Sequence, residues 1–275
     1  MPRRAESRAP LRVALLGSHR APGHRFLLEE DGNRGAVYDL VCALTSEPEF
    51  EAKPALEAAG VPVLVYDIHE FYRARGARLS DLDVRRDYDR ATLQALRPYR
   101  PDVIVLAGYL YLLTEPMLEA FPDRIVNVHD SDLRLAGADG RPRYRGLRST
   151  RDAIFAGEPE TRATAHVVTA ELDGGPPLVR SGGFPVHPLV VAARAWGATD
   201  ILKAYAYAHR EWVIRSSWGP LLAKAIEVVA QREGGFLESE AVVRGARPPL
   251  EITLDPGLVP APEPLGSFGS GSWSP

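Results

Sequence analysis

Two polar side chains interrupt an apolar run of the chain, and their types suit acyl-transfer chemistry. Asn127 and His129 alternate with Val126 and Val128. Successive side chains of a strand point to opposite faces, so the amide and the imidazole are expected side by side. Both groups donate hydrogen bonds, and two donors aimed at one oxygen stabilise a developing oxyanion. Taken singly, an asparagine or a histidine at a strand end more often has a structural role.

A carboxylate in a glycine-rich turn is the third candidate. The segment 171–176 reads ELDGGP, and Gly174 and Gly175 predict a turn that residues with a Cβ resist. Asp173 then has two interpretations. Its carboxylate either caps the local backbone of the turn, or it faces His129, orients that ring and relays a proton. Spacing in the sequence does not decide between them.

The elements around these groups follow an α/β pattern. Short apolar runs predict buried strands over residues 11–17, 38–45, 61–66, 102–107 and 124–129. Helical stretches over 53–59 and 85–96 lie between some of them. Strands that alternate with helices predict an α/β fold with a mainly parallel twisted sheet flanked by helices. Sites in such sheets collect at the carboxyl ends of the strands, where Asn127 and His129 are expected.

The second half of the chain has a different order of elements. We expect strands and then helices, over residues 164–169, 178–186, 192–216 and 220–231. The domain organisation expected from these patterns is a disordered leader (1–9), a catalytic domain (10–235) and a short extension packed on it (236–259). The Pro-, Gly- and Ser-rich end (260–275) lacks apolar periodicity and is expected to be disordered.

Composition narrows the class of protein. Hydrophobic residues make up 45% of the 275 residues and charged residues 25%, which is typical of a globular enzyme. The net charge of −3 argues against a nucleic-acid partner held by gross positive charge, and no apolar run is long enough to span a membrane. The single cysteine, Cys42, excludes an intrachain disulfide and is expected to be a buried strand thiol in a cytoplasmic protein.

Five short motifs occur in an order that is typical of one family. They are Val105–Tyr109, Asn127–His129, Arg145–Leu147, Thr164–Val168 and Glu171–Pro176. Together they resemble the glycinamide ribonucleotide formyltransferase family, within the superfamily that includes methionyl-tRNA formyltransferase and formyltetrahydrofolate deformylase. The resemblance runs from Leu11 to about Gln231. It implies a Rossmann-like formyltransferase domain with 10-formyltetrahydrofolate as co-substrate and no metal.

The resemblance also implies roles for individual residues. Asn127, His129 and Asp173 match the catalytic asparagine, histidine and aspartate of the family, and Asp173 also belongs to the folate site. The segment that matches the pterin pocket comprises Leu106, Ala107, Gly108, Tyr109, Leu110, Tyr111 and Leu112. His166 matches a family histidine on the neighbouring strand, for which direct contact with substrate and structural support are equally open.

The loop after the first strand departs from the family. Members that act on glycinamide ribonucleotide carry SGxGSN there, and its backbone N–H groups cradle the substrate phosphate. Here residues 17–25 read GSHRAPGHR, and proline has no N–H to donate. One interpretation is that this chain holds an anion by side chains instead, namely Ser18, Arg20, His24 and Arg25. The other interpretation is a solvated basic loop.

The loop after His129 departs as well. The family commonly continues PSLLP, whereas this chain has DSDL and then a longer stretch rich in arginine and glycine. Its basic residues are Arg134, Arg141, Arg143 and Arg145. They are expected either to bind an acidic substrate, with Arg145 as the first candidate, or to form an exposed lid or a solubilising charge.

These observations predict formyl transfer to a primary amine of a small molecule by a monomer or homodimer. The leading single substrate is 5-phosphoribosylglycinamide, in purine biosynthesis. Because both loops differ from the family, a sugar-nucleotide amine or a natural-product amine is the alternative. Hydrolysis of formyltetrahydrofolate is less favoured, because few residues precede the first strand. A non-catalytic binding protein is disfavoured by the presence of Asn127, His129 and Asp173 together.

Overall fold

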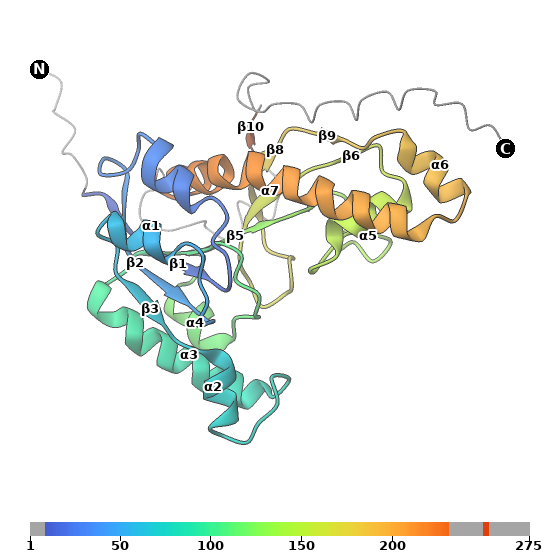
Figure 1. Cartoon of the computed structure of the whole chain (residues 1–275). Helices are drawn as coiled ribbons and strands as arrows, with labels where there is room; N and C mark the ends of the chain where they lie inside the picture. Colours follow the sequence, from blue (N-terminus) through green and yellow to red (C-terminus); the bar gives the residue numbers. More distant parts are fainter. Residues whose placement is uncertain (1–8, 231–249, 253–275) are drawn as a thin grey trace, which may run out of the picture.

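The computed structural model describes residues 9–230 and 250–252 (Figure 1). Its elements up to β5 are β1 (Leu11–Gly17), η1 (Phe26–Glu30), β2 (Tyr38–Thr45), α1 (Lys53–Ala58), β3 (Val63–Val65), α2 (Ile68–Arg73), α3 (Leu82–Leu96), η2 (Arg97–Tyr99), β4 (Val103–Leu106), α4 (Glu115–Ala120) and β5 (Ile125–His129). The remaining elements are α5 (Ser149–Ala156), β6 (Glu160–Thr161), β7 (Thr164–Val167), β8 (Pro177–Ser181), β9 (Phe184–Pro185), α6 (Leu189–Ala195), α7 (Thr199–Ala230) and β10 (Leu250–Ile252).

The main sheet has eight strands in the order β10-β8-β7-β5-β4-β1-β2-β3. Strands β5, β4, β1, β2 and β3, which are neighbours in this order, are all parallel, and β10 is parallel to β8. Strand β7 runs antiparallel to both of its neighbours, β5 and β8. Strands β6 and β9 form a separate antiparallel pair. The predicted α/β fold with a mainly parallel sheet is therefore confirmed, and β7 is the exception within it.

Both faces of the sheet are buried under helices (Figure 1). Val105 and Val126 belong to a core cluster that includes residues of α7. Ile104 and Ile125 point the other way, into a cluster that includes residues of α3 and α4. Strands buried on both faces are continuously apolar in sequence, which is why β4 is an unbroken apolar run, whereas Asn127 and His129 interrupt β5 near its end.

The same alternation sets the direction of the two polar residues of β5. Asn127 and His129 are two and four positions beyond Ile125, so they share its face of the sheet, on the side of α3 and α4. Val126 and Val128 point toward α7 instead. The expected pairing of an amide and an imidazole on one face follows directly from this register.

The prediction of two separate helices over 192–216 and 220–231 is wrong. A single helix, α7, runs through Pro220, and a shorter helix, α6, precedes it. A proline inside a helix costs about 3 kcal/mol, because it removes one hydrogen bond and crowds the preceding turn. Trp218 and Leu221 are buried on either side of Pro220, so packing against the sheet outweighs that local cost.

Other boundaries follow from local chemistry. Helix α3 begins at Leu82 rather than at residue 85, because the Asp81 carboxylate accepts hydrogen bonds from the N–H groups of Asp83 and Val84. Cys42 is fully buried in β2, as expected, and burial raises the pKa of its thiol to about 12.

The predictions for the chain ends fall mostly outside the described residues. The leader, the extension and the tail were expected over 1–9, 236–259 and 260–275, and of these only residue 9 and β10 are described. Strand β10 pairs parallel with β8 at the edge of the sheet. Within the described residues, no helix combines the length and apolarity that crossing a membrane requires.

Candidate active site

The strand order changes direction between β1 and β4, and this point lies beside the catalytic candidates. The chain builds outward through β2 and β3 on one side and through β5 on the other. Ligands of open α/β sheets bind at such a switch, outside the carboxyl ends of the strands. The loops that follow β1 and β4 meet there, since the Ser18 N–H donates to the Gly108 carbonyl at 3.3 Å.

Four polar side chains converge at the end of β5. Asn127 pairs with His166 of β7 in the antiparallel register, and Asn127 Nδ2 lies 3.2 Å from His166 Nε2. Asp173 Oδ1 lies 3.5 Å from His129 Nδ1 and 3.9 Å from His166 Nε2. His129, His166 and Asp173 are each buried. The three residues that the sequence singled out are thus brought together, with His166 among them.

His166 has a single consistent protonation state. Its Nδ1 lies 2.9 Å from the Val167 carbonyl, which only accepts, so Nδ1 carries the proton. Burial, and then the neighbouring His129, lower the pKa of His166 to about 4. The ring is therefore neutral near pH 7, and its Nε2 accepts a hydrogen bond from the Asn127 amide. This bond fixes the amide and leaves its second N–H directed elsewhere.

The turn that carries Asp173 holds the carboxylate in place. Asp173 adopts a left-handed conformation with φ of 53°. A Cβ on Gly175 would lie 1.7 Å from the Val167 carbonyl oxygen, so only glycine fits where the turn meets β7. The second carboxylate oxygen of Asp173 accepts a hydrogen bond from the Gly146 N–H at 2.7 Å. One oxygen is thereby anchored, while the other faces the two histidines.

His129 is oriented by the loop that follows it. Its Nε2 lies 3.1 Å from the Tyr144 carbonyl, and the Ser131 hydroxyl donates to the same oxygen at 2.7 Å. Because a carbonyl only accepts, the Nε2 atom must carry a proton. The Nδ1 atom is left facing Asp173. A backbone contact that closes over the ring in this way sets its tautomer and direction.

Residues 106–114, called the donor segment here, turn sharply at the end of β4. Gly108 has φ of 71°, and a Cβ there would lie 2.9 Å from Pro22 Cδ. Leu106, Ala107 and Tyr109 are buried. Two other side chains, Leu110 and Leu112, are 46% and 55% exposed. Large exposed apolar side chains at this edge are suited to packing against the face of a flat ring.

A buried ion pair from α3 holds the donor segment from behind. Arg85 lies 3.2 Å from Asp89, and its guanidinium also donates to the Tyr109 hydroxyl at 2.8 Å. Asp89 accepts from the N–H and the hydroxyl of Thr114, both at 2.6 Å. The Tyr111 hydroxyl donates to the buried Glu47 at 2.6 Å. The donor segment is therefore fixed at three points by charged side chains.

The first loop, residues 17–25, holds four of the predicted substrate-binding residues in different settings. Ser18 is fully buried, and its hydroxyl accepts from the Leu110 N–H at 3.1 Å. Arg20 makes a two-point ion pair with Glu211 of α7. His24 Nδ1 lies 2.7 Å from the Ala21 carbonyl, and Arg25 is exposed.

The second loop, residues 130–145, forms a compact turn. Its two arms are joined by hydrogen bonds between Gly137 and Arg141 and between Leu135 and Arg143. Its arginines lie beside carboxylates: Arg141 with Glu171 at 2.8 Å, Arg143 with Glu158 at 3.0 Å, and Arg145 with Asp139 at 3.5 Å and Glu171 at 3.9 Å. Arg145 directly precedes the glycine that anchors Asp173.

The residue after His129 ties this end of β5 to α7. Asp130 is buried, and it accepts hydrogen bonds from Arg210 at 2.8 Å and from the Trp218 indole at 2.6 Å. Burial raises the pKa of Asp130, although both partners and the nearby His129 oppose that shift. Asp130 therefore links the end of β5 to α7, the helix that carries Glu211.

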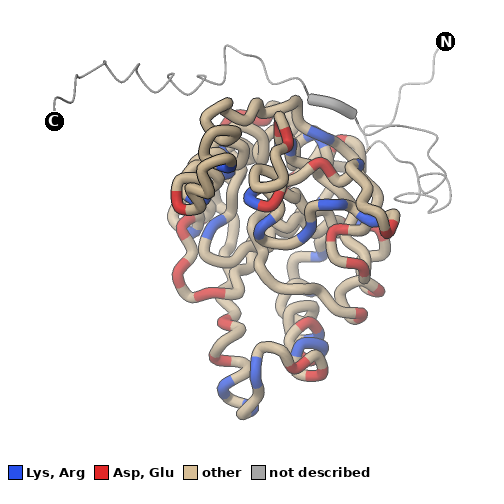
Figure 2. The backbone as a smooth tube through the Cα atoms, turned by 90° about the vertical axis from the view of Figure 1, so that its right-hand side faces the viewer, with Lys and Arg blue, Asp and Glu red and all other residues tan. Residues whose placement is uncertain are grey.

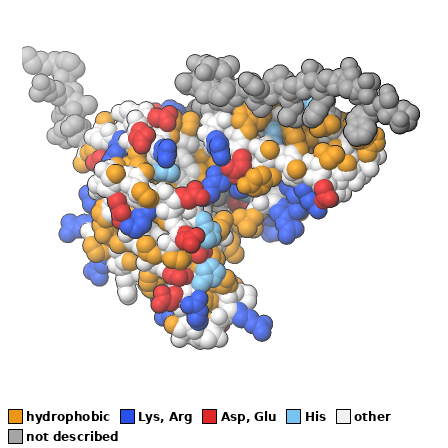
Figure 3. Space-filling model, in the orientation of Figure 1, with side chains coloured by type: hydrophobic (Ala, Val, Ile, Leu, Met, Phe, Trp, Pro, Cys, Tyr) orange, Lys and Arg blue, Asp and Glu red, His pale blue; other side chains and the backbone are white. Residues whose placement is uncertain are grey.

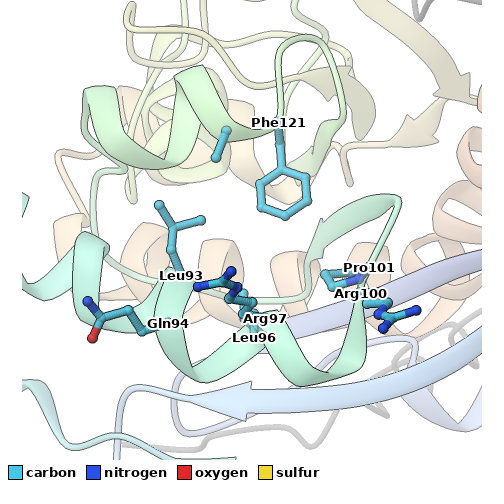
Figure 4. Close-up of a pocket in the computed structure, with 8 residues that line it drawn as sticks. Leu93, Gln94, Leu96, Arg97, Arg100, Pro101 and Phe121 are labelled. Atoms are coloured by element: carbon cyan, nitrogen blue, oxygen red, sulfur yellow. The ribbon is translucent and has the colours of Figure 1, made fainter.

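One cavity lies away from this site and another borders it. One, of about 400 Å³, lies between α3, η2 and α4, where Leu93, Arg97 and Phe121 line it (Figure 4). It also contacts Pro101, before β4, and so lies at the opposite end of that strand from the candidate site. The other, of about 460 Å³, adjoins the second loop at Ser131 and Tyr144. Among the described residues, no group of His, Cys, Asp or Glu is arranged to hold a metal ion.

Several residues that shape the site were not singled out as site residues from the sequence. Tyr144 and Gly146 act through backbone groups, which any residue carries, although Gly146 lies in the RGL motif. Asp89 and Glu211 contact partners that are distant along the chain. Only the proximity of Arg85 and Asp89, four positions apart on an expected helix, could have indicated a pair.

With this geometry in view, residues 11–187 match the sequence model of the formyl transferase family. The match covers well over half of the chain, so the chain belongs to the formyl transferase family. The family resemblance carried by the five motifs is thereby confirmed.

Individual relatives refine this picture. The phosphoribosylglycinamide formyltransferase of Escherichia coli (strain K12) is 36% identical over 102 residues, which is 37% of this chain and 44% of the relative. A formyltetrahydrofolate deformylase of Bacillus subtilis (strain 168) is 37% identical over 94 residues, covering 34% of this chain and 29% of the relative. The matched part thus spans less than half the length of these relatives.

Solved structures share the fold. The glycinamide ribonucleotide transformylase 1 of Symbiobacterium toebii is 26% identical, with a TM-score of 0.54, and covers 75% of this chain and 87% of its own. A phosphoribosylglycinamide formyltransferase of Bacillus halodurans is 20% identical, with a TM-score of 0.58 over 82% of this chain and 100% of its own, and this likeness concerns the fold alone.

Proposed function

We propose that this chain transfers a formyl group from 10-formyltetrahydrofolate to a primary amine, and that Asn127, His129 and Asp173 carry the reaction. The observation that supports this most is their convergence at the carboxyl edge of the sheet, with Asp173 Oδ1 3.5 Å from His129 Nδ1. Membership of the formyl transferase family supports the donor.

The donor segment is the proposed folate site. The left-handed Gly108 keeps the backbone close to the sheet edge, where N–H and carbonyl groups can bond to a flat ring. Leu110 and Leu112 offer apolar surface to the same ring. Asp173, with one oxygen anchored by Gly146, adds a carboxylate acceptor for the ring's N–H groups. These residue types fit a pterin, which is flat and polar at its edge.

Asn127 has the clearest proposed role in the chemistry. The folate supplies an activated formyl group. The bond from the formyl carbon to the folate nitrogen breaks, a bond to the amine nitrogen forms, and one proton passes from the amine to the folate nitrogen. Negative charge builds on the formyl oxygen during the exchange. Asn127 donates one N–H to neutral His166, so the second N–H is available to that oxygen.

His129 and Asp173 are proposed to act as a pair. Because Nε2 of His129 donates to the Tyr144 carbonyl, Nδ1 can donate to the formyl oxygen only when the ring is protonated. The Asp173 carboxylate faces Nδ1 and is placed to balance that positive charge. The same carboxylate is the proposed acceptor for the proton that leaves the attacking amine.

The relatives suggest two outcomes for the formyl group. Their names include phosphoribosylglycinamide formyltransferases, which makes phosphoribosylglycinamide the first amine to test, followed by amines of sugars and sugar nucleotides. The similarity to a formyltetrahydrofolate deformylase favours hydrolysis as a second candidate function, in which water takes the place of the amine.

The test is an amine panel with 10-formyltetrahydrofolate and the full chain, read by the mass gain of the amine and by free formate. We expect a formylated amine. Asn127→Ala and Asp173→Asn should each lower kcat by about 10²–10³-fold, because each removes a group that bonds during the transfer. Asn33→Ala, at an asparagine outside the site, is the control.

Two results would contradict the proposal. Formate release with no formylated amine would identify a hydrolase. If Asn127→Ala or Asp173→Asn keeps full turnover and the melting temperature of the unmodified chain, the residue that was changed does not have its proposed role.

A further inference from the structure

The first loop is tied to α7 by a two-point ion pair. Arg20 Nη1 and Nη2 donate to Glu211 Oε1 and Oε2, at 2.8 and 3.1 Å. The side chain of Glu211 is 16% exposed and that of Arg20 is 39% exposed, so the pair remains partly open to solvent. A planar guanidinium facing a planar carboxylate has a fixed geometry that a lysine cannot reproduce.

Both partners of this pair stay charged. The hydrogen bond from Arg20 holds the pKa of Glu211 below its usual value, and the same bond raises the pKa of Arg20. Glu51 adds a second carboxylate, 3.9 Å from Arg20 Nε. A dianionic group that approaches Arg20 therefore meets negative charge on two sides.

Several backbone positions of the first loop cannot donate to a phosphate as the N–H groups of the family's glycine-rich loop do. The Ser18 N–H donates to the Gly108 carbonyl, and the His24 N–H donates to the Ala21 carbonyl. Pro22 has no N–H. Burial lowers the pKa of His24, so its ring adds no charge near pH 7. At these three positions the loop offers no free backbone N–H to a phosphate.

Most of the positive charges of the second loop are also paired with carboxylates. Arg141, Arg143 and Arg145 each lie within ion-pair distance of a carboxylate. Figure 2 shows Lys and Arg interspersed with Asp and Glu along the chain, and Figure 3 shows both signs side by side across the middle of one face. Arg25 and Arg134 are exposed, and neither has an ion pair within the described residues. The surroundings of the proposed acceptor site are thus mostly charge-balanced.

Resting on the proposed formyl transfer, we propose that the Arg20–Glu211 pair determines acceptor specificity. It selects a hydroxyl-bearing amine without a phosphate, of which an amino sugar is the simplest kind, over a phosphorylated amine. The paired groups offer both donors and acceptors to hydroxyl groups. They offer no net charge to a phosphate, and Glu211 adds a like charge against it, which is how sites reject a wrong ligand.

The experiment compares amines that differ only in a phosphate. Glucosamine is paired with glucosamine 6-phosphate, and glycinamide riboside with its 5-phosphate, under matched 10-formyltetrahydrofolate. We expect the unphosphorylated member of a pair to have the higher kcat/KM. Glu211→Gln keeps the shape of the side chain but removes its charge, and it should shift the ratio toward the phosphorylated amine by about tenfold or more. Glu227→Gln, on the same helix and beside Lys224, is the matched control.

Binding of inorganic phosphate is measured in parallel by calorimetry, so the inference is tested even without turnover. Glu211→Gln should bind phosphate more tightly than the unmodified chain, and Arg20→Gln together with Glu211→Gln should lose that gain. If the unmodified chain prefers the phosphorylated amines, or binds phosphate as tightly as Glu211→Gln, the inference is wrong while formyl transfer stands. If no amine is formylated, the proposed function fails, and phosphate binding alone decides the role of the pair.

Discussion

The donor segment and the two loops that depart from the family are held in place differently. The donor segment is held by buried charged residues, Arg85 and Asp89 of α3 and Glu47 of the loop after β2. The first loop is tied to α7 by the partly exposed pair of Arg20 and Glu211. The second loop begins at the buried Asp130, but its later arginines, Arg141 and Arg143, form ion pairs that are partly or largely exposed. The part with buried contacts is the part where the sequence follows the family, whereas the loops depart from it.

This difference indicates where the fold tolerates amino-acid substitutions. An exposed ion pair contributes about 0–1 kcal/mol, so its loss or rearrangement leaves the fold intact. Removal of one partner from a buried pair leaves an isolated charge and costs about 3–5 kcal/mol. Single substitutions in the exposed ion pairs of the two loops should therefore be tolerated, whereas substitutions in the buried pair behind the donor segment should not.

The largest effect is expected from Asp89→Asn. The substitution leaves the buried Arg85 without its carboxylate and weakens both bonds to Thr114, so it should lower the free energy of unfolding by about 3–5 kcal/mol. Where the variant still folds, its KM for 10-formyltetrahydrofolate should rise more than its KM for the amine. Denaturant unfolding and initial rates measure the two quantities.

The matched control is Asp83→Asn on the same helix. Asp83 pairs with Arg86, but its side chain is 93% exposed, so a change below about 1 kcal/mol is expected. An equal loss in both variants would show that the donor segment has no special dependence on the buried pair.

Acid should lower the stability of the protein through His166, which lies outside both regions. Burial lowers the pKa of His166 from 6.5 to about 4, so the unfolded chain binds more protons between these values. The stability linked to neutral His166 is full above about pH 6.5 and falls as the pH drops toward 4, by up to about 3 kcal/mol. His166→Gln should flatten the decline in unfolding free energy over that window. An unchanged slope would contradict a neutral, buried His166.

Ser18→Ala should affect both regions moderately. It removes the acceptor for the Leu110 N–H and the partner of the Ser46 hydroxyl, and one unsatisfied buried group costs about 1–3 kcal/mol. We expect a lower melting temperature together with weaker folate binding, measured by scanning calorimetry and fluorescence titration. Stability loss with unaltered folate affinity would separate the first loop from the donor segment.

The smallest effect is expected from Arg141→Gln in the second loop. Its ion pair with Glu171 is exposed, so unfolding should change by less than about 1 kcal/mol. Folate affinity should also stay the same. A large loss of stability in this variant would show that the second loop depends on its ion pairs as strongly as the donor segment does.

Most of the sheet could be predicted because its strands are buried on both faces. Runs 11–17 and 38–45 are mostly apolar, apart from Arg12 and Asp39 near their starts, and their predicted bounds coincide with β1 and β2. Helix α7 could not be predicted as one element, because Pro220 is a local signal to stop and the burial that overrides it depends on distant strands. Tertiary packing, rather than propensity, decides such a case.

The candidate site could be predicted where family motifs and strand periodicity coincide. Asn127 and His129 were expected on one face because alternation fixes their direction. The spacing in the sequence could not place Asp173 beside His129. The turn at 171–176 comes close to His129 only in the folded sheet. The pairing of Arg20 with Glu211 lay beyond prediction for the same reason, as 191 positions separate them.

The buried hydroxyl of Ser18 limits how this scaffold can be recombined. Its backbone N–H binds Gly108 and its side chain binds Leu110, so one residue belongs structurally to two neighbouring loops. A loop transplanted from a relative to change the accepted amine would carry new residues into this junction. Successful grafts should retain a small hydroxyl side chain at position 18, and libraries that randomise it together with the rest of the loop should yield mostly inactive chains.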